Sequence, residues 1–263
     1  IKMNIIVCLK QVPGTTTVKI DSQTNTMVRQ GIENIVNPFD TYAIEEGARI
    51  KERYGGKVTV LSMGPPQAEA VLREAIGGGA DEAILLSDSA FAGSDTLATS
   101  YTLARAISKI GEYDLVICGR QTIDGDTGQV GPELAEMLEM PFVAYASQIE
   151  EIDDGHMRVQ RMVEDGHEVI ETSLPAVITV VKEINVPRLP SLRGLTKAKR
   201  AVISVWGIQE LEADRGMVGL SGSATKVIKI FFPDRVQHGE ILEGSSESKV
   251  ASLVDKLRNA NLI

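Results

Sequence analysis

Cysteine, histidine and net positive charge are all scarce in this 263-residue chain, and each scarcity excludes a class of protein. Two cysteines cannot build a disulfide scaffold, and this low number is typical of a protein in a reducing compartment. The spacing of the three histidines supports neither a catalytic triad nor a zinc site. Lys and Arg total 27 against 36 Asp and Glu, which gives a net charge of −9. The clustered positive field that nucleic acid or an anionic membrane surface requires is therefore not expected.

Long apolar runs are also missing. The longest, residues 176–181, has the length of a strand and falls far short of the roughly 20 residues that span a bilayer. Lys10 and Gln11 interrupt the first apolar stretch almost at once, so no signal peptide is expected. Hydrophobic residues nevertheless make up 43% of the chain, which is ample for a core. We expect a soluble, cytoplasmic protein of one or two domains.

Short apolar segments and amphipathic stretches alternate along the first 140 residues. The apolar segments are rich in β-branched residues and cover 5–9, 58–62, 83–86 and 115–118. Apolar residues recur at helical spacing between them, over 38–54, 67–76 and 95–110. Such alternation indicates a parallel sheet covered by helices on both faces. The sequence therefore predicts an α/β fold with a doubly wound, mostly parallel, Rossmann-like sheet.

The pattern changes after Pro141. Polar and apolar residues alternate over 156–163 and on either side of it, and the pairs Asp154-Gly155 and Asp165-Gly166 separate these runs. Asp-Gly between alternating runs is a strong hairpin signal, so we expect an antiparallel section added to the edge of the sheet. A buried strand over 176–181 follows it.

The final third of the chain predicts less regular structure. Pro187 and Pro190 forbid regular structure in 185–194, and the basic run 197–200 is expected on a solvated face. Beyond residue 200 the sequence is polar and mixed, with one strand over 227–232 and a helix over 246–259. Because such a tail buries little core alone, we expect an arm packed on a partner or back on the body.

The most informative segment is 119–131, which follows the strand 115–118. Ligands of open parallel sheets bind outside the carboxyl ends of the strands, where this segment would lie. Its four glycines allow close approach of the backbone and direct several N–H groups at one anion. A helix beginning near 128–132 would add the positive end of its dipole. A pyrophosphate is the ligand that best suits this segment. The alternative interpretation, a solvated loop that only turns the chain, is not excluded by the sequence.

Other candidates are weaker. Asn37-Pro38-Phe39-Asp40 opens a helix at the same edge and could hold an adenine or ribose, but a helix cap alone explains it. Cys8 and Cys118 end apolar strands as buried small hydrophobes. Asp124 and Asp126 lack a third metal ligand at a recognisable spacing. With no set of residues for acid–base or nucleophilic catalysis, any chemistry would belong to a cofactor.

Several spaced motifs, in order, resemble the electron transfer flavoprotein beta subunits. The segment most like the family signature is Val159-x-Arg161-x-x-Glu164-Asp165-Gly166-x-Glu168-x-Ile170, followed by Pro175-x-Val177-Ile178-Thr179-Val180. The family's motifs are also matched by Lys10, 37–46, 62–65, 79–81 and 119–130. The resemblance runs from about residue 3 to residue 199 and is loose beyond Arg200.

This resemblance implies a fold like the adenine-nucleotide-binding α/β domains and an obligate heterodimer with a larger alpha subunit. Carried over by motif, the nucleotide-contacting residues are Cys8, Asn37, Pro38, Phe39, Asp40, Met63, Gly119, Arg120, Gln121, Thr122, Ile123, Asp124, Gly125, Asp126, Thr127, Gly128, Gln129 and Val130. The division implied is a nucleotide domain over 1–184, a docking loop over 185–200 and an arm on the alpha subunit over 201–263. Leu192 would anchor partner dehydrogenases, unless it tucks under its own loop.

Two branches of the family differ at the loop. Ordinary members bind AMP structurally, and their loop ends in a threonine whose hydroxyl meets the phosphate, whereas electron-bifurcating members hold a second FAD here. Val130 stands at the threonine position, while Gly125 and Gly128 leave room for a longer dinucleotide. The resemblance therefore favours the bifurcating type.

In that type NADH would reduce the FAD. Electrons would pass to an acyl-CoA dehydrogenase-type flavoenzyme and to ferredoxin or flavodoxin, with no residue of this chain as a catalytic acid or base. Any NADH-oxidising activity would belong to the heterodimer.

Three alternatives remain open. The first is an ordinary AMP-binding electron carrier, and the second is a purely structural nucleotide-binding subunit. The third is an ATP-using enzyme of the related adenine nucleotide hydrolase-like fold, although residues 10–14 are not that group's Ser-Gly-Gly-x-Asp-Ser loop.

Overall fold

The computed structural model describes residues 2–14, 19–20, 27–28, 33–228 and 239–263. The chain divides into two compact units, which we describe separately. The larger comprises residues 1–19 and 27–228, and the smaller comprises 20–26 and 229–263. Within the described residues, no helix is long and apolar enough to cross a bilayer.

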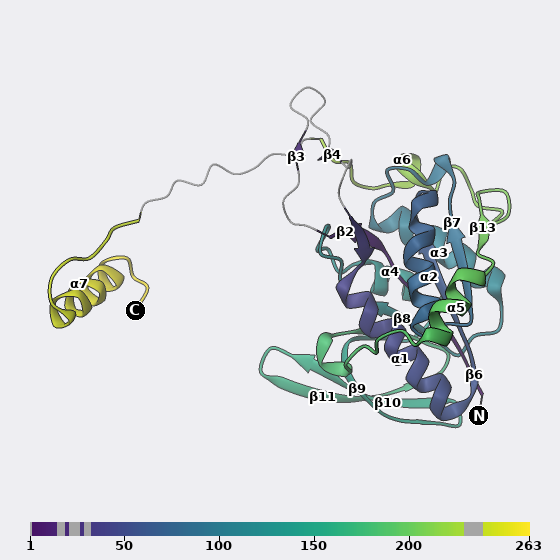
Figure 1. The fold of residues 1–263 in the computed structure, drawn as a ribbon, viewed down its shortest axis with the longest axis horizontal. Helices are drawn as coiled ribbons and strands as arrows, with labels where there is room; N and C mark the ends of the chain where they lie inside the picture. Colours follow the sequence, from purple (N-terminus) through teal and green to yellow (C-terminus); the bar gives the residue numbers. More distant parts are fainter. Residues whose placement is uncertain (1, 15–18, 21–26, 29–32, 229–238) are drawn as a thin grey trace. The chain divides into compact units, whose positions relative to one another are not determined.

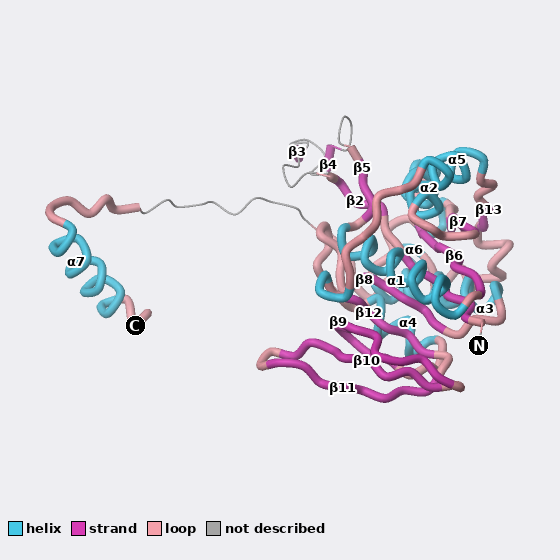
Figure 2. The backbone as a smooth tube through the Cα atoms, turned by 60° about the horizontal axis from the view of Figure 1, so that its bottom comes forward, coloured by secondary structure: helices cyan, strands magenta, loops and turns pink. Residues whose placement is uncertain are grey.

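A nine-stranded, mostly parallel sheet forms the centre of the larger unit (Figure 1). Its order is β11-β10-β9-β12-β8-β1-β6-β7-β13. The strands are β1 (Met3–Cys8), β6 (Gly56–Met63), β7 (Glu82–Leu86), β8 (Leu115–Gly119), β9 (Phe142–Asp153), β10 (His156–Val163), β11 (Gly166–Ser173), β12 (Ala176–Val180) and β13 (Ser204–Trp206). Only the β9–β10 and β10–β11 pairings are antiparallel, and Figure 2 shows these strands together at one end of the sheet. The predicted α/β class is confirmed.

Small sheets and helices complete the structure. Two short pairs are β2 (Gln11–Pro13) with β5 (Asn34–Val36), and β3 (Lys19–Ile20) with β4 (Met27–Val28). The helices are α1 (Pro38–Tyr54), α2 (Glu69–Gly77), α3 (Thr96–Ile110), α4 (Val130–Met137), α5 (Leu192–Arg200), α6 (Gly219–Gly222) and, in the smaller unit, α7 (Ser246–Asn259). Three single turns of 3₁₀ helix are η1 (Pro66–Ala68), η2 (Ser89–Phe91) and η3 (Lys182–Ile184).

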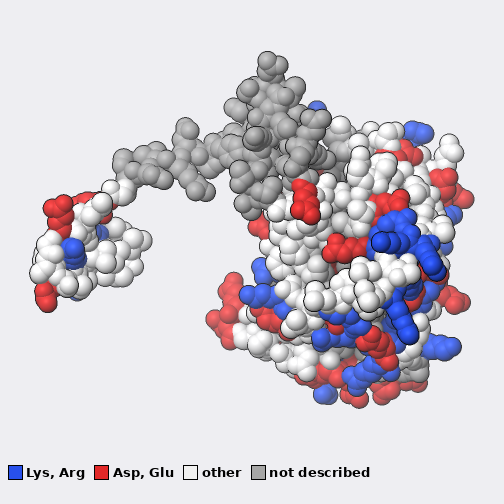
Figure 3. Space-filling model, viewed as in Figure 1, with Lys and Arg blue, Asp and Glu red and all other residues white. Residues whose placement is uncertain are grey.

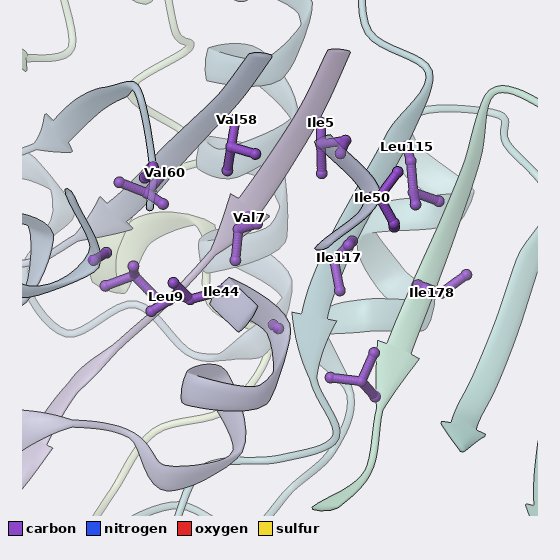
Figure 4. Packing of buried hydrophobic residues seen from close by; sticks show 14 of the residues in the cluster. Ile5, Val7, Leu9, Ile44, Ile50, Val58, Val60, Leu115, Ile117 and Ile178 are labelled. Atoms are coloured by element: carbon purple, nitrogen blue, oxygen red, sulfur yellow. The ribbon is translucent and has the colours of Figure 1, made fainter. Parts of the chain in front are cut away.

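Two hydrophobic clusters lie on opposite faces of the sheet. Successive strand residues point to opposite faces, so Ile5 and Val7 of β1 pack with α1 and α2, whereas Ile6 packs with α3 and α4. Figure 4 shows the first of these clusters, with Ile5 and Val7 beside side chains of α1. The near-continuous apolar strands therefore arise because both faces are covered. Their carboxyl ends are left free to carry the polar loops.

The structure corrects two details of the sequence interpretation. Residues 192–200 form a helix, although 185–194 were expected to lack regular structure. The basic residues Lys197, Lys199 and Arg200 are exposed, as expected, and Lys197 Nζ donates to Ala80 O at 2.9 Å and pairs with Asp81. The second hairpin turns at Glu164 and Asp165, because Val163 pairs with Gly166.

The end of the larger unit also differs from expectation. Residues 204–206 form β13, which extends the sheet beyond β7, so this stretch belongs to the body and not to an arm. The predicted strand 227–232 lies mostly outside the described residues, and its first two residues are not in a strand. The predicted helix 246–259 is confirmed as α7, none of whose residues is buried.

Candidate nucleotide-binding site

The candidate site lies at the carboxyl edge of the sheet, around the loop that follows β8. Because β1 pairs with β8 on one side and β6 on the other, Lys10 after β1 and Met63 at the end of β6 lie at this same edge. Helix α1 also begins here, and α4 begins where the loop 120–129 ends. Segments far apart in the sequence are thereby brought together, as expected for a doubly wound sheet.

Asn37 joins three of these segments. Its Nδ2 donates to Gln121 O at 2.9 Å and to Asp40 Oδ1 at 3.0 Å, while its Oδ1 accepts from Ile123 N at 3.2 Å. Its backbone N donates to Lys10 O at 2.9 Å. The side chain is fully buried and does not cap α1, contrary to the simple capping interpretation. Asn37 therefore fixes the loop against α1 and β1.

Asp40 is the buried carboxylate beneath the loop. It is 4% exposed and accepts from the backbone N of Lys10 at 2.7 Å in addition to Asn37. Burial raises its pKa to about 7, although these hydrogen bonds and the charge of Lys10 oppose the shift. A Cβ at Gly119 would overlap Asp40 Oδ1 and lie 2.8 Å from the carbonyl carbon of Phe39. Glycine is therefore required at position 119.

The loop 120–129 is held by its own polar groups. Lys10 Nζ pairs with Asp124 at 2.8 Å, and Gln121 Nε2 donates to Asp126. Burial by itself would raise the pKa of Asp124, but the Lys10 hydrogen bond and charge outweigh it and hold that pKa below its ordinary value. Asp126 and Gly128 have φ angles of 55° and 65°, in the left-handed region. These internal contacts fix the shape of the loop and leave most of its residues exposed.

Helix α4 begins with Val130, directly after the loop. No side chain caps its N-terminus, so the first N–H groups have no side-chain acceptor. A Cβ at Gly131 would overlap Thr179 Cγ2 of β12, so the start of α4 lies close against the sheet. An uncapped N-terminus beside an exposed glycine-rich loop is suited to bind a phosphate group.

The remaining predicted contact residues differ in exposure. Cys8 is buried opposite Cys118 in the β1–β8 register. A hydrogen bond with Cys8 and burial together raise the pKa of the Cys118 thiol, which fits packing instead of reactivity. Met63 is half-buried at the end of β6. Direct nucleotide contact by each of these residues stays a prediction.

A cavity of about 780 Å³ adjoins the site, and the sequence did not reveal it. It shares Phe39 and Arg120 with the predicted contact set and adds Tyr145, Arg161 and Lys182. The Arg120 guanidinium lies 5.0 Å from the centre of the Tyr145 ring, and Tyr145 has a φ of 59°. Arg161 Nε is buried and makes no hydrogen bond with the described residues, although it forms an ion pair with Glu168 Oε2 at 3.5 Å. The only sequence signal was that Arg161 belongs to the signature-like segment.

Comparison with known proteins decides the family. Residues 24–211 match the electron transfer flavoprotein domain. The electron transfer flavoprotein subunit beta of Thermoanaerobacterium thermosaccharolyticum is 48% identical over 262 residues, which cover 99% of this chain and all of that protein. The chain belongs to the electron transfer flavoprotein beta subunits.

Two further relatives widen this family context. The caffeyl-CoA reductase-Etf complex subunit CarD of Acetobacterium woodii is 48% identical over 263 residues, covering 99% of this chain and all of CarD. Protein FixA of Azotobacter vinelandii is 46% identical over 252 residues, which cover 92% of this chain and 88% of FixA. An electron transfer flavoprotein beta subunit acts with an alpha subunit, so a partner chain is part of the functional protein. The ATP-using enzyme considered from the fold alone is thereby set aside.

Proposed function

We propose that this beta subunit belongs to the bifurcating type and holds FAD on the loop 119–130. The observation that carries the proposal is the start of α4. Its N-terminus is uncapped, and the residue there is Val130, whose side chain packs against the core and has no hydroxyl for a terminal phosphate. Gly125 lies in open space apart from Thr122 Oγ1 at 3.4 Å, so a longer dinucleotide meets little obstruction in the loop.

The residues present fit a dinucleotide. Gly119 is required to be a glycine by its close approach to Asp40 and Phe39, and the exposed loop beyond it offers backbone N–H groups to a pyrophosphate. Cys8, Met63 and residues 37–40 are proposed to line the adenosine end. When bound, FAD would supply the hydride acceptance and one-electron chemistry that side chains cannot.

The chain's own residues are proposed to position and not to catalyse. Asn37 and Asp40 use their side chains internally, so they would shape the loop, and any contact with the nucleotide would come from their backbone. Lys10 holds Asp124 across the mouth of the loop and offsets part of its negative charge. None of these groups is placed as a general acid or base.

The electron route is proposed from the resemblance and from the relatives. NADH would be the donor, and an acyl-CoA dehydrogenase-type flavoenzyme and ferredoxin or flavodoxin the acceptors, in the cytoplasm. Residues 185–200 would dock the dehydrogenase, and Leu192, which is 84% exposed, would be the anchor. CarD, as its name states, belongs to a caffeyl-CoA reductase-Etf complex, which supports a partner that acts on an acyl-CoA. An ordinary AMP-binding subunit is the second candidate.

Nucleotide analysis of the purified heterodimer tests the cofactor. We expect two FAD per heterodimer and no AMP, because Val130 at the start of α4 offers no hydroxyl to a terminal phosphate. Absorbance of released flavin and chromatography of the extract measure both. One FAD together with one AMP would contradict the proposal and assign the chain to the ordinary branch.

A loop variant tests the position of the FAD. Val130→Thr combined with Gly125→Asp adds a hydroxyl and narrows the loop, so we expect loss of FAD from this subunit relative to AMP. Val169→Thr is the control, because it adds a hydroxyl at an exposed position of β11, outside the predicted contact set. Unchanged flavin retention in the double variant would show that the loop 119–130 does not hold the FAD.

A further inference from the structure

Residues 185–191 lie along α1 and are attached to it by polar side chains. Arg188 Nε donates to Glu45 Oε2 at 2.7 Å, and its Nη2 donates to Glu45 Oε1 at 3.1 Å. The guanidinium also pairs with both carboxylate oxygens of Glu52, about two turns further along α1. We call Arg188, Glu45 and Glu52 the Arg188 clasp. A planar fork held by two carboxylates fixes both distance and orientation.

The inner half of the clasp is buried. Glu45 is only 4% exposed, and it also accepts from Arg49 Nε at 2.7 Å and from the backbone N of Arg188 at 3.1 Å. Burial by itself would raise the pKa of Glu45, but the hydrogen bonds from Arg188 and Arg49 outweigh it and hold that pKa below its ordinary value. Glu45 therefore stays ionised, and removal of Arg188 would leave a buried carboxylate with one partner fewer.

A second polar anchor precedes the clasp. Asn185 Nδ2 donates to Glu46 Oε2 at 2.9 Å and to Tyr42 O at 3.0 Å. Pro187 lies between the two anchors, and Pro190 follows them, so the segment cannot form a regular ladder of backbone hydrogen bonds. Its attachment to α1 depends on these side chains.

The leucine side chains at the end of the segment contribute no such attachment. Leu189 is 91% exposed, and Leu192, at the first turn of α5, is 84% exposed. Figure 3 shows basic side chains gathered over α5, and acidic and basic side chains mixed over the rest of this face. We call Leu189 and Leu192 the leucine ridge. Because the Arg188 clasp holds the segment that carries these exposed apolar side chains, the ridge is preorganised for contact with another protein.

The other end of α5 is held independently of the clasp. Arg73 Nη1 donates to Ala198 O at 2.7 Å and to Ala201 O at 3.1 Å, at the C-terminal end of α5. A Cβ at Gly194 would overlap Gly77 O, so α5 lies in direct contact with the end of α2. Loss of the clasp would therefore release residues 186–191 and leave Asn185 and α5 in place.

We propose that Arg188 is a positioning residue, which, clasped by Glu45 and Glu52, holds the leucine ridge in the orientation that binds the partner flavoenzyme. The inference rests on the proposed docking function of residues 185–200. Helix α1 would then have two roles. Its first turn forms part of the nucleotide site, and its later turns hold the docking segment. The described contacts of Arg188 are with Glu45 and Glu52 of α1 and do not include the nucleotide loop.

Hydrogen exchange measured by mass spectrometry on the heterodimer is the first test. Arg188→Ala is expected to speed amide exchange in residues 186–191 about tenfold and to leave residues 194–200 unchanged. Arg193→Ala is the matched control, since Arg193 is exposed and makes no hydrogen bond or ion pair with any residue that the structure describes. Equal exchange in the Arg188 variant and the wild type would overturn the proposal.

Steady-state electron transfer to a purified acyl-CoA dehydrogenase is the second test. Arg188→Ala should raise the KM for the dehydrogenase about tenfold with kcat unchanged, because docking and not electron transfer is impaired. Arg188→Lys keeps the charge but loses the fork, and Glu52→Gln removes only the exposed partner, so both should give smaller increases in KM. These two milder variants carry the test if Arg188→Ala does not fold.

Leu192→Ala separates this inference from the docking function itself. A rise in KM for Leu192→Ala without any rise for Arg188→Ala overturns the role of the clasp. Unchanged KM in both variants, with faster exchange in Arg188→Ala, overturns the docking function and with it the purpose assigned to the clasp. A rise in KM in both variants, with faster exchange only in Arg188→Ala, supports both.

Discussion

Two buried polar residues determine the shape of the nucleotide loop. Asn37 and Asp40 are both buried. The side chain of Asn37 binds Gln121 and Ile123, more than eighty residues away, and the side chain of Asp40 binds Asn37 and the backbone N of Lys10. Buried polar groups are tolerated only when their hydrogen bonds are satisfied, and these form a connected set that includes Lys10 N. The hydrogen bonds inside the site therefore require an asparagine and an aspartate at these two positions as much as any ligand does.

Asp40 should make the stability of the protein depend on pH. Its pKa rises from the ordinary 3.8 to about 7 through burial, so between these values the folded protein binds more protons than the unfolded chain. The free energy of unfolding should therefore fall as pH rises from about 4 to about 7, by at most ~1.4 kcal/mol per pH unit from this group. Asp40→Asn should remove that part of the slope.

Urea unfolding across this pH range measures the effect. Asp153→Asn, which changes an exposed carboxylate at the end of β9, is the control and should keep the wild-type slope. A wild-type slope in Asp40→Asn would show that the carboxyl of Asp40 does not titrate in this range.

At the scale of elements, the site depends on how α4 meets the sheet. The helix begins directly after the loop, and its second residue, Gly131, lies against Thr179 of β12. Thr179 Oγ1 also accepts from Tyr145 N at 3.1 Å, at the irregular part of β9 beside the cavity. The position of the α4 N-terminus is therefore set by close packing on two strands.

Gly131→Ala should push α4 away from β12. We expect a loss of about 1–3 kcal/mol in the free energy of unfolding from the overlap, together with weaker nucleotide retention. Thr179→Ser removes the overlapping methyl and keeps the hydroxyl, so the double variant should recover most of the loss. A double-mutant cycle by urea unfolding measures this coupling, and simple additivity of the two changes would contradict it.

At the scale of the whole molecule, the fold of the larger unit does not depend on the C-terminal residues. Both hydrophobic clusters are made by residues 3–218, and α7 in the smaller unit has no buried residue. Its exposed apolar residues include Val250 and Leu253, at the spacing of one helix face. These observations support the proposal that the end of the chain acts on the alpha subunit.

Truncation after Ile228 should therefore leave the thermal unfolding temperature of this chain within about 2 °C of the full-length value. It should sharply reduce recovery of the heterodimer, because the proposed arm is lost. Differential scanning calorimetry and size-exclusion chromatography with the alpha subunit measure the two effects. Unchanged heterodimer recovery would contradict the arm, and unfolding of the truncated chain would contradict the independence of the larger unit.

Local sequence patterns determined most of the secondary structure. Helix α1 spans the predicted residues 38–54, with Pro38 at its start and Gly55 in the left-handed region after its end, and α7 likewise matches its prediction. The Asp154-Gly155 turn also matches, since Asp153 pairs with His156. These features depend on neighbours in sequence, where caps, turns and apolar spacing act directly.

Tertiary contacts decided the features that the sequence alone did not reveal. Helix α5 forms beside two prolines because Arg73 binds its last carbonyls and Gly194 meets Gly77. Asn37 ceases to be a cap because Gln121 and Ile123 offer it better partners once β8 lies beside β1. The sequence by itself thus determined the parallel sheet, its carboxyl edge and the glycine-rich loop, through patterns of short range. Which side chains meet across that edge was decided by the pairing of distant strands, since hydrogen bonds between such residues exist only after the sheet has formed.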